Sequence, residues 1–187
     1  MKISHIVASV AVALCASQAG AQSLSFVAAT AGNYSAIVGL TGGFTNYPAD
    51  VVSVATRPLF DLNDFSAITV GDPSPVATLT FAAGVTSFSF LWGSPDLTNS
   101  LGVSGNSGTV TFTGLSAFGS GIANGSNTNT QFVTISDVKG LNKLTFSTGS
   151  IAFEVAQVSA VPEPETYALM LAGLGAVGFI ARRRKSA

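Results

Sequence analysis

The alternation of apolar and polar residues in the middle of the chain constrains its fold most strongly. Residues Val76–Phe81 alternate, and Val85–Trp92 repeat the pattern with Phe88, Phe90 and Trp92 on one face. Because successive side chains of a β-strand point to opposite faces, a two-residue period indicates strands with one buried face. No window of more than a few residues before residue 161 shows a convincing helical period, so the middle of the chain predicts a β protein.

Other segments rich in β-branched and aromatic residues are separated by Gly, Asn and Ser, so that roughly eight to ten short strands are expected. These expected strands are Ser23–Ala29, Ala36–Leu40, Val51–Thr56, Thr109–Thr113, Phe132–Ile135, Leu144–Phe146 and Ile151–Val158. Turns or loops are expected at 41–43, 104–108 and 119–129, and a loop or a short edge strand at 60–65. The pattern predicts an all-β fold, an antiparallel β-sandwich. A jelly-roll-like topology is preferred, and an immunoglobulin-like Greek key remains open.

The first 21 residues have the pattern of a secretory signal peptide. Lys2 supplies the positive charge, Ile6–Ala16 forms a short apolar stretch, and Ala19 and Ala21 are small residues at the cleavage positions. Cleavage after Ala21 would make Gln22 the first residue of the exported protein.

The last 27 residues have three parts in a fixed order. A rigid polar tripeptide comes first, then an uncharged apolar run (Thr166–Ala181), then a basic cluster. The tripeptide is Pro162, Glu163 and Pro164, and the basic cluster is Arg182, Arg183, Arg184 and Lys185. The run reaches about 24 Å as a helix, short of the roughly 30 Å hydrocarbon core, so it predicts one short transmembrane helix that thins the bilayer locally. The cluster should stay cytoplasmic and leave the preceding chain outside.

This tail resembles the PEP-CTERM sorting signal of Gram-negative bacteria. The resemblance implies exosortase, a membrane-embedded enzyme, as a partner, and removal of the tail near the Pro-Glu-Pro motif. It also implies transient residence in the inner membrane and delivery to the cell surface or extracellular matrix of a bacterium that makes exopolysaccharide and biofilm. A plain C-terminal membrane anchor is the alternative. The chain is therefore expected to comprise a signal peptide (1–21), an exported β-sandwich domain (22–160) and a sorting signal (161–187).

The exported region lacks the side chains on which many enzymes depend. The only histidine, His5, and the only cysteine, Cys15, both precede residue 22. Cys15 follows the bulky Leu14, which disfavours a lipid-modified cysteine. Residues 22–160 therefore have no Ser-His or Cys-His pair, no disulfide and no zinc ligands. Three cations against seven anions give this region a net charge of −4, which excludes a nucleic-acid surface.

Two stretches of the exported region resemble a family of exosortase-dependent surface proteins. They are Phe88–Leu101, which contains the sequence Trp-Gly-Ser-Pro-Asp, and Ala152–Val155, which closes the domain. The resemblance implies a β-sandwich surface domain. Thr98 stands where that family usually has tyrosine, and Ala156-Gln157 replaces its acidic-Asn pair, which puts a shared ligand site in doubt.

Asp96, Asn99 and Glu154 are the candidate ligand residues of these stretches. Their hard oxygen atoms, with Trp92 nearby, suit a Ca²⁺ or sugar site. In the alternative interpretation the segment is a structural turn, in which Asp96 and Asn99 satisfy loop amides while Glu154 faces solvent.

These features predict a non-enzymatic exported protein with a structural or adhesive role in the exopolysaccharide matrix, with no catalytic residue and no required cofactor. A carbohydrate- or Ca²⁺-binding module is the alternative, and a polysaccharide-acting enzyme is a further one.

Overall fold

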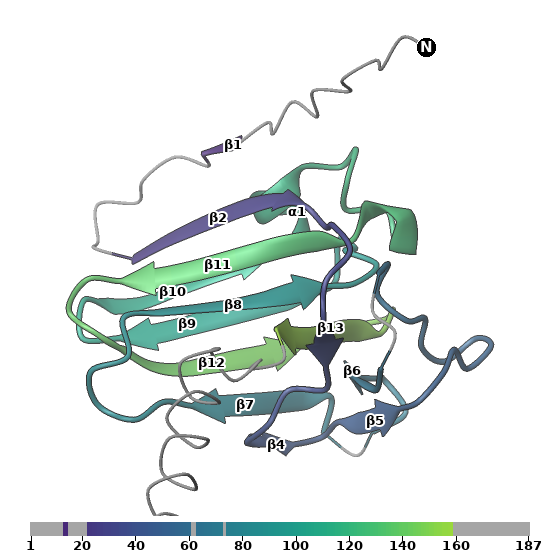
Figure 1. Cartoon of the computed structure of the whole chain (residues 1–187), viewed down its shortest axis with the longest axis horizontal. Helices are drawn as coiled ribbons and strands as arrows, with labels where there is room; N and C mark the ends of the chain where they lie inside the picture. The colour runs from purple at the N-terminus through teal and green to yellow at the C-terminus, as the bar shows by residue number, and fades with distance from the viewer. Residues whose placement is uncertain (1–12, 15–21, 61–62, 73, 159–187) are drawn as a thin grey trace, which may run out of the picture.

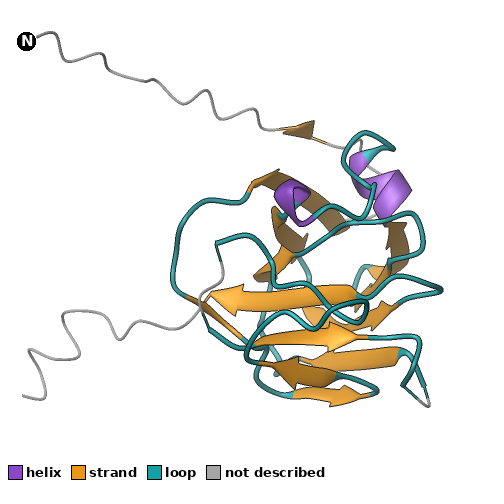
Figure 2. Cartoon of the chain, turned by 90° about the vertical axis from the view of Figure 1, so that its right-hand side faces the viewer, coloured by secondary structure: helices purple, strands orange, loops and turns teal. Residues whose placement is uncertain are grey.

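The computed structural model describes residues 13–14, 22–60, 63–72 and 74–158. The predicted cleavage residues Ala19 and Ala21 lie outside this part of the chain, as do the Pro-Glu-Pro motif, the apolar run and the basic cluster. No helix within the described residues is long and apolar enough to cross a membrane. The described residues form two antiparallel sheets packed face to face, as the alternation predicts (Figures 1 and 2).

The larger sheet has the strand order β1-β2-β11-β8-β13-β6-β5, and β3 also pairs with β13. Its strands are β1 (Ala13–Leu14), β2 (Gln22–Ala28), β3 (Tyr34–Ser35), β5 (Thr45–Tyr47), β6 (Phe65–Ile68), β8 (Ser87–Trp92), β11 (Gln131–Asp137) and β13 (Phe153–Val158). The smaller sheet has the order β10-β9-β12-β7-β4. Its strands are β4 (Leu40–Gly42), β7 (Val76–Thr80), β9 (Ser100–Gly105), β10 (Gly108–Thr113) and β12 (Leu141–Ser147).

From β6 onward the chain crosses from one sheet to the other at every connection except the one between β9 and β10. Strands β6, β8, β11 and β13 belong to the larger sheet, and β7, β9, β10 and β12 to the smaller one. In space they lie in the orders β11-β8-β13-β6 and β10-β9-β12-β7. This alternation of eight strands is the pattern of a jelly roll, the topology that the sequence favoured.

Aromatic side chains fill the space between the sheets. Phe88, Phe90 and Trp92 lie along one face of β8, with stacked rings at centroid distances of 6.1 and 6.3 Å. Trp92 also stacks on Phe153 of β13 at 4.3 Å, and Phe146 of β12 contacts Phe90 edge-on at 5.5 Å. Such ring pairs contribute about 0.5–1.5 kcal/mol each beyond their burial. Packing of this kind holds together a domain that has no cysteine.

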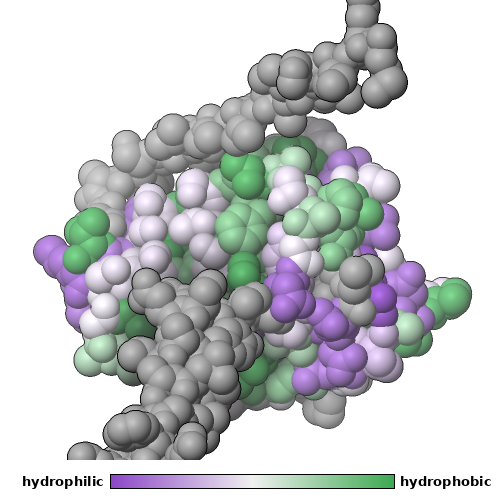
Figure 3. Space-filling model, viewed as in Figure 1, coloured by the Kyte–Doolittle hydropathy of each residue, from purple (hydrophilic) through white to green (hydrophobic). Residues whose placement is uncertain are grey.

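A second, smaller cluster lies on the outer side of the larger sheet. The segment between β2 and β6 covers this side, and Ala55 packs there among Tyr34, Phe65, Leu91 and Ala156. The coloured part of the face drawn in Figure 3 mixes hydrophobic, neutral and hydrophilic side chains, with the hydrophilic ones gathered near β5 and β6.

The expected strand at Val51–Thr56 is wrong. Val51 and Ala55 pair with each other across a tight turn, and Ser53 has a positive φ of 62°. Val52 is 91% exposed. A β-branched sequence favours a strand only where a neighbouring strand is available, and here Val51 and Ala55 pair only with each other while Ala55 alone of these residues is buried.

Smaller expectations also need correction. The turn expected at 104–108 is confined to residues 106–107, because β9 ends at Gly105 and β10 begins at Gly108. Residues 36–39 are not in a strand, and Leu40–Gly42 forms β4 where a turn was expected at 41–43. A short helix, α1 (Gly114–Phe118), follows β10 without having been predicted; its first turn is fixed by reciprocal hydrogen bonds between Thr113 and Ser116. The loop at 119–129 is confirmed, apart from a 3₁₀ turn at Asn127–Asn129.

Strand β2 begins at Gln22, the residue that the predicted cleavage would expose. The Gln22 side-chain amide donates to the carbonyl of Gly108 at 2.7 Å and to Oδ2 of Asp137 at 3.1 Å. Burial opposes the ionisation of Asp137, but hydrogen bonds from Ser107, the Lys139 amide and Gln22 outweigh it and lower its pKa from 3.8 to about 2. Asp137 is therefore a structural carboxylate that fastens the start of β2 to the hairpin between β9 and β10.

Candidate functional site

The turn that follows β8 begins at Gly93, where the chain passes close to two side chains. The Gly93 amide donates to the carbonyl of Glu154 on the neighbouring strand at 2.8 Å. A Cβ atom at this position would lie 2.8 Å from Cγ of Pro58 and 3.1 Å from Cβ of Glu154. Only glycine fits between them, so the Trp-Gly-Ser sequence reflects this close approach. The next residue, Ser94, has a positive φ of 35°, a conformation that is costly for a residue with a side chain.

Asp96 organises the rest of the turn with one of its two carboxylate oxygens. Its Oδ1 accepts from the Thr98 amide at 2.5 Å, the Thr98 hydroxyl at 2.6 Å and the Asn99 amide at 3.2 Å. This is the local hydrogen bonding by which aspartate shapes turns. Its other oxygen, Oδ2, is buried without a partner. A structural role in the turn therefore explains the hydrogen bonds of Oδ1 but gives no partner to Oδ2.

Asn99 is completely buried and links the turn to β13. Its Oδ1 accepts from the indole N–H of Trp92 at 3.1 Å, and its amide donates to the carbonyls of Ile151 and Ala152 at 3.2 and 3.4 Å. These bonds satisfy both ends of the side chain. Asn99 therefore orients Trp92 within the core, and its side-chain atoms are not left over for a ligand.

Glu154 does not face solvent, contrary to one of the two interpretations of the sequence. Its side chain is 2% exposed, because the turn at 51–58 covers this part of β13. Oε1 accepts from the Thr56 amide at 3.1 Å, and Oε2 is buried without a partner. Burial is the main cause that raises the pKa of Glu154 from 4.5 to about 8, and the negative charge of Asp96 raises it further. The Thr56 amide opposes the shift in part by its hydrogen bond, and the Ser94 hydroxyl opposes it because it lies near the carboxylate, although its geometry is not that of a hydrogen bond.

A cavity of about 270 Å³ lies beside Glu154 and Ser94. The turn at Ser53–Thr56 and the segment Ser150–Ala152 form its other walls, together with Gly125. The Ser94 side chain is 2% exposed, and its hydroxyl has no hydrogen-bond partner. Ser94 and Glu154 line this cavity, Asp96 follows Ser94 by two residues, and each of the three side chains has one oxygen atom without a hydrogen-bond partner in the described part of the chain.

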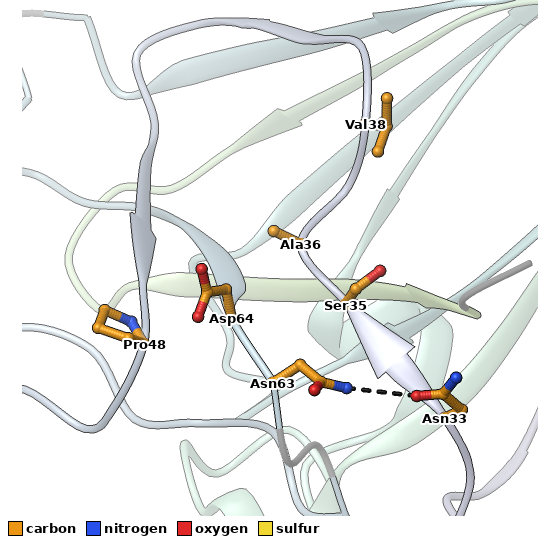
Figure 4. A pocket seen from close by; sticks show the side chains of 7 residues that line it. All are labelled: Asn33, Ser35, Ala36, Val38, Pro48, Asn63 and Asp64. Atoms are coloured by element: carbon orange, nitrogen blue, oxygen red, sulfur yellow. Dashed lines mark hydrogen bonds between the residues drawn. The ribbon is translucent and has the colours of Figure 1, made fainter.

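A second pocket lies on the surface next to β3 and β5. Its volume is about 620 Å³, and Figure 4 shows the side chains that surround it. They are Asn33, Ser35, Ala36, Val38, Pro48, Asn63 and Asp64. The Asn63 amide donates to Oδ1 of Asn33 at 3.4 Å and also to the carbonyl of Tyr34. The pocket offers amide, hydroxyl and carboxylate groups that can bind a hydroxylated ligand.

The sequence located Asp96, Asn99 and Glu154, and the fold brings these three residues to one end of the larger sheet. It missed Ser94, which carried no signal beyond its place in the Trp-Gly-Ser sequence. It also missed the pocket at Asn33 and Asn63, because those residues meet only through the pairing of strands far apart in the chain. No group of three or more carboxylate, imidazole or thiol side chains gathers within the described residues.

Comparison with known proteins identifies the tail. Residues 160–185 match the model of the PEP-CTERM protein-sorting motif. The resemblance seen in the sequence is thereby confirmed, and the motif supports an exported protein that exosortase processes during its transit toward the cell surface. The comparisons found no similar curated protein and no similar solved structure.

Proposed function

We propose that this exosortase-sorted protein is a non-enzymatic component of the cell surface or extracellular matrix, with a structural or adhesive role in association with exopolysaccharide. The observation that carries the proposal is the sorting motif at residues 160–185, which follows a β-sandwich domain in the sequence. A domain delivered outside the cell and stabilised by packing can serve as a building block of a matrix without any chemistry of its own.

The burial of the two carboxylates favours a non-enzymatic role. A glycosidase uses two carboxyl groups with different pKa values, which flank the bond to be cleaved. Asp96 and Glu154 are close enough to interact, but each is 2% exposed. A polysaccharide chain has to contact both groups at once, and the small cavity beside Glu154 does not admit one.

The pocket at Asn33 and Asn63 is the surface that best suits contact with a polysaccharide. Its volume lies within the usual range for ligand pockets, roughly 300–1,000 Å³. Its polar side chains match the donors and acceptors of sugar hydroxyls. The low positive charge of the exported region means that contact would depend on hydrogen bonding rather than on attraction to acidic polymers.

Co-sedimentation of the detergent-solubilised full chain with matrix polysaccharide tests this proposal. Asn33→Ala should weaken binding by roughly three- to tenfold, because one or two polar contacts are lost. Asn142→Ala is the matched control, since Asn142 is also exposed and also engages another asparagine, at 3.1 Å, but lies on the smaller sheet. No binding by the unmodified chain would refute the association, and equal loss in both variants would refute the assignment to this pocket.

A further inference from the structure

Three buried oxygen atoms at one end of the larger sheet have no hydrogen-bond partner among the described residues. They are Oγ of Ser94, Oδ2 of Asp96 and Oε2 of Glu154, and each of the three side chains is 2% exposed. A buried polar atom that loses its water and finds no partner costs about 1–3 kcal/mol, and more when it is charged. Three such atoms in one small region therefore require an explanation.

Two of the three oxygens belong to residues that line one cavity, and the third belongs to a residue close to them. Ser94 and Glu154 line the same cavity of about 270 Å³. Asp96 follows Ser94 by two residues in the same turn and acts electrostatically on Glu154. The other oxygen of each carboxylate is held by backbone amides, of Thr98 and Asn99 for Asp96 and of Thr56 for Glu154. In both carboxylates, one oxygen is therefore held by backbone hydrogen bonds, and the other oxygen is free to bind a ligand.

In the part of the chain that the structure describes, no cation is paired with these carboxylates. Arg57 follows Thr56 in sequence, but its guanidinium donates to the carbonyl of Pro48, and its Nε is buried without a partner. Within the described residues, no ion pair joins a lysine or arginine to either carboxylate. A buried pair of carboxylates without a counter-charge is unfavourable unless the groups are protonated or bind a metal ion.

We propose that Ser94, Asp96 and Glu154 form a binding site for a divalent cation, with Ca²⁺ as the ion that fits best. Ligands that are all oxygen exclude the metals that prefer nitrogen or sulfur. Ca²⁺ accepts about six to eight oxygen ligands in irregular geometry, so water in the cavity and backbone carbonyls can complete three side-chain ligands. Two carboxylates neutralise its charge.

The bound cation would fasten three segments together. The turn after β8 supplies Ser94 and Asp96, β13 supplies Glu154, and the turn at Ser53–Thr56 is attached through the Thr56 amide. An extracellular domain without cysteine has no disulfide to hold its loops, and a metal clip serves the same purpose. This inference stands apart from polysaccharide binding and uses a different part of the molecule.

Thermal unfolding of the detergent-solubilised full chain, with Ca²⁺ added after treatment with a chelator, tests the site. Extracellular Ca²⁺ modules bind with dissociation constants of roughly 0.1–1 mM, so about 10 mM Ca²⁺ should raise the Tm by about 5 °C. Asp96→Asn and Glu154→Gln should abolish the rise. Each amide keeps the anchored oxygen and replaces the presented one with nitrogen. Asp64→Asn, in the surface pocket, is the control and should respond as the unmodified chain does.

Terbium luminescence gives a second measurement that does not depend on stability. Trp92 is the only tryptophan of the chain and lies two residues before Ser94, so Tb³⁺ in the site should emit when the indole is excited. Addition of Ca²⁺ should quench this emission, and both amide variants should lack it while retaining native circular dichroism. Either of two results would overturn the proposal: an unmodified chain that gives neither a Tm shift nor sensitised emission, or a response lost in Asp64→Asn but kept in Glu154→Gln.

Discussion

The raised pKa of Glu154 predicts how the stability of the domain depends on pH in the absence of metal. The pKa is 4.5 in the unfolded chain and about 8 in the folded one, so folding favours the protonated carboxyl group. The contribution of this group to stability is fully present below pH 4.5 and is lost as the pH rises through about 8. At 1.36 kcal/mol per pKa unit, the free energy of unfolding should fall by roughly 4 kcal/mol between pH 5 and pH 8. This is a large part of the 5–15 kcal/mol typical of a domain.

Urea unfolding followed by circular dichroism, with chelator present at each pH, measures this change. Glu154→Gln should remove the slope, because its amide does not titrate, and should be more stable than the unmodified chain above about pH 8. Asp137, whose pKa of about 2 lies far below this window, should not interfere. The reasoning is refuted if the unmodified chain and Glu154→Gln show parallel curves from pH 5 to pH 8.

Two further substitutions test the turn after β8. Gly93→Ala should destabilise the domain by about 1–3 kcal/mol, because the new methyl group would lie 2.8 Å from the Pro58 ring. Gly121→Ala, at a position with no atom within 4 Å of a new Cβ, should have little effect; equal urea midpoints for the two variants would contradict the close approach. Asn99→Ala should cost roughly 2–4 kcal/mol, because the Trp92 indole and two carbonyls lose their partner. An unchanged Trp92 emission spectrum and unchanged stability would show that these bonds are not formed.

The sequence predicted the sandwich well where strands have one buried and one open face. The burial of the side chains of β11 alternates along the whole strand, because one side faces the core and the other is partly exposed. In β8 the alternation is lost at its end, where Leu91 is buried in the outer cluster. The prediction from alternation failed where the outer face of a strand is buried as well as its inner face. In β13, Phe153, Glu154 and Val155 are all buried, since the turn at 51–58 packs over the strand. The alternation of apolar and polar residues in a strand does not indicate whether another segment packs over its outer face.

The candidate site was found only in part, for a related reason. Asp96 and Asn99 lie in one turn, so their nearness was visible in the sequence. Glu154 is 58 residues further on, and its nearness to Asp96 results from the pairing of β8 with β13, where Trp92 lies opposite Val155. In Asp96 and Glu154, one carboxylate oxygen accepts hydrogen bonds and the other has none. This difference depends on side-chain geometry, which the pattern of residues does not encode.

The mass of the protein recovered from outside the cell tests most directly whether the β-sandwich domain is exported and its C-terminal sorting signal is removed. Sorting through the PEP-CTERM motif predicts a product that begins at Gln22 and ends before Thr166. Intact-mass and terminal-peptide spectrometry of the extracellular fraction would identify both ends. An extracellular product that retains Arg182–Lys185 would contradict the account.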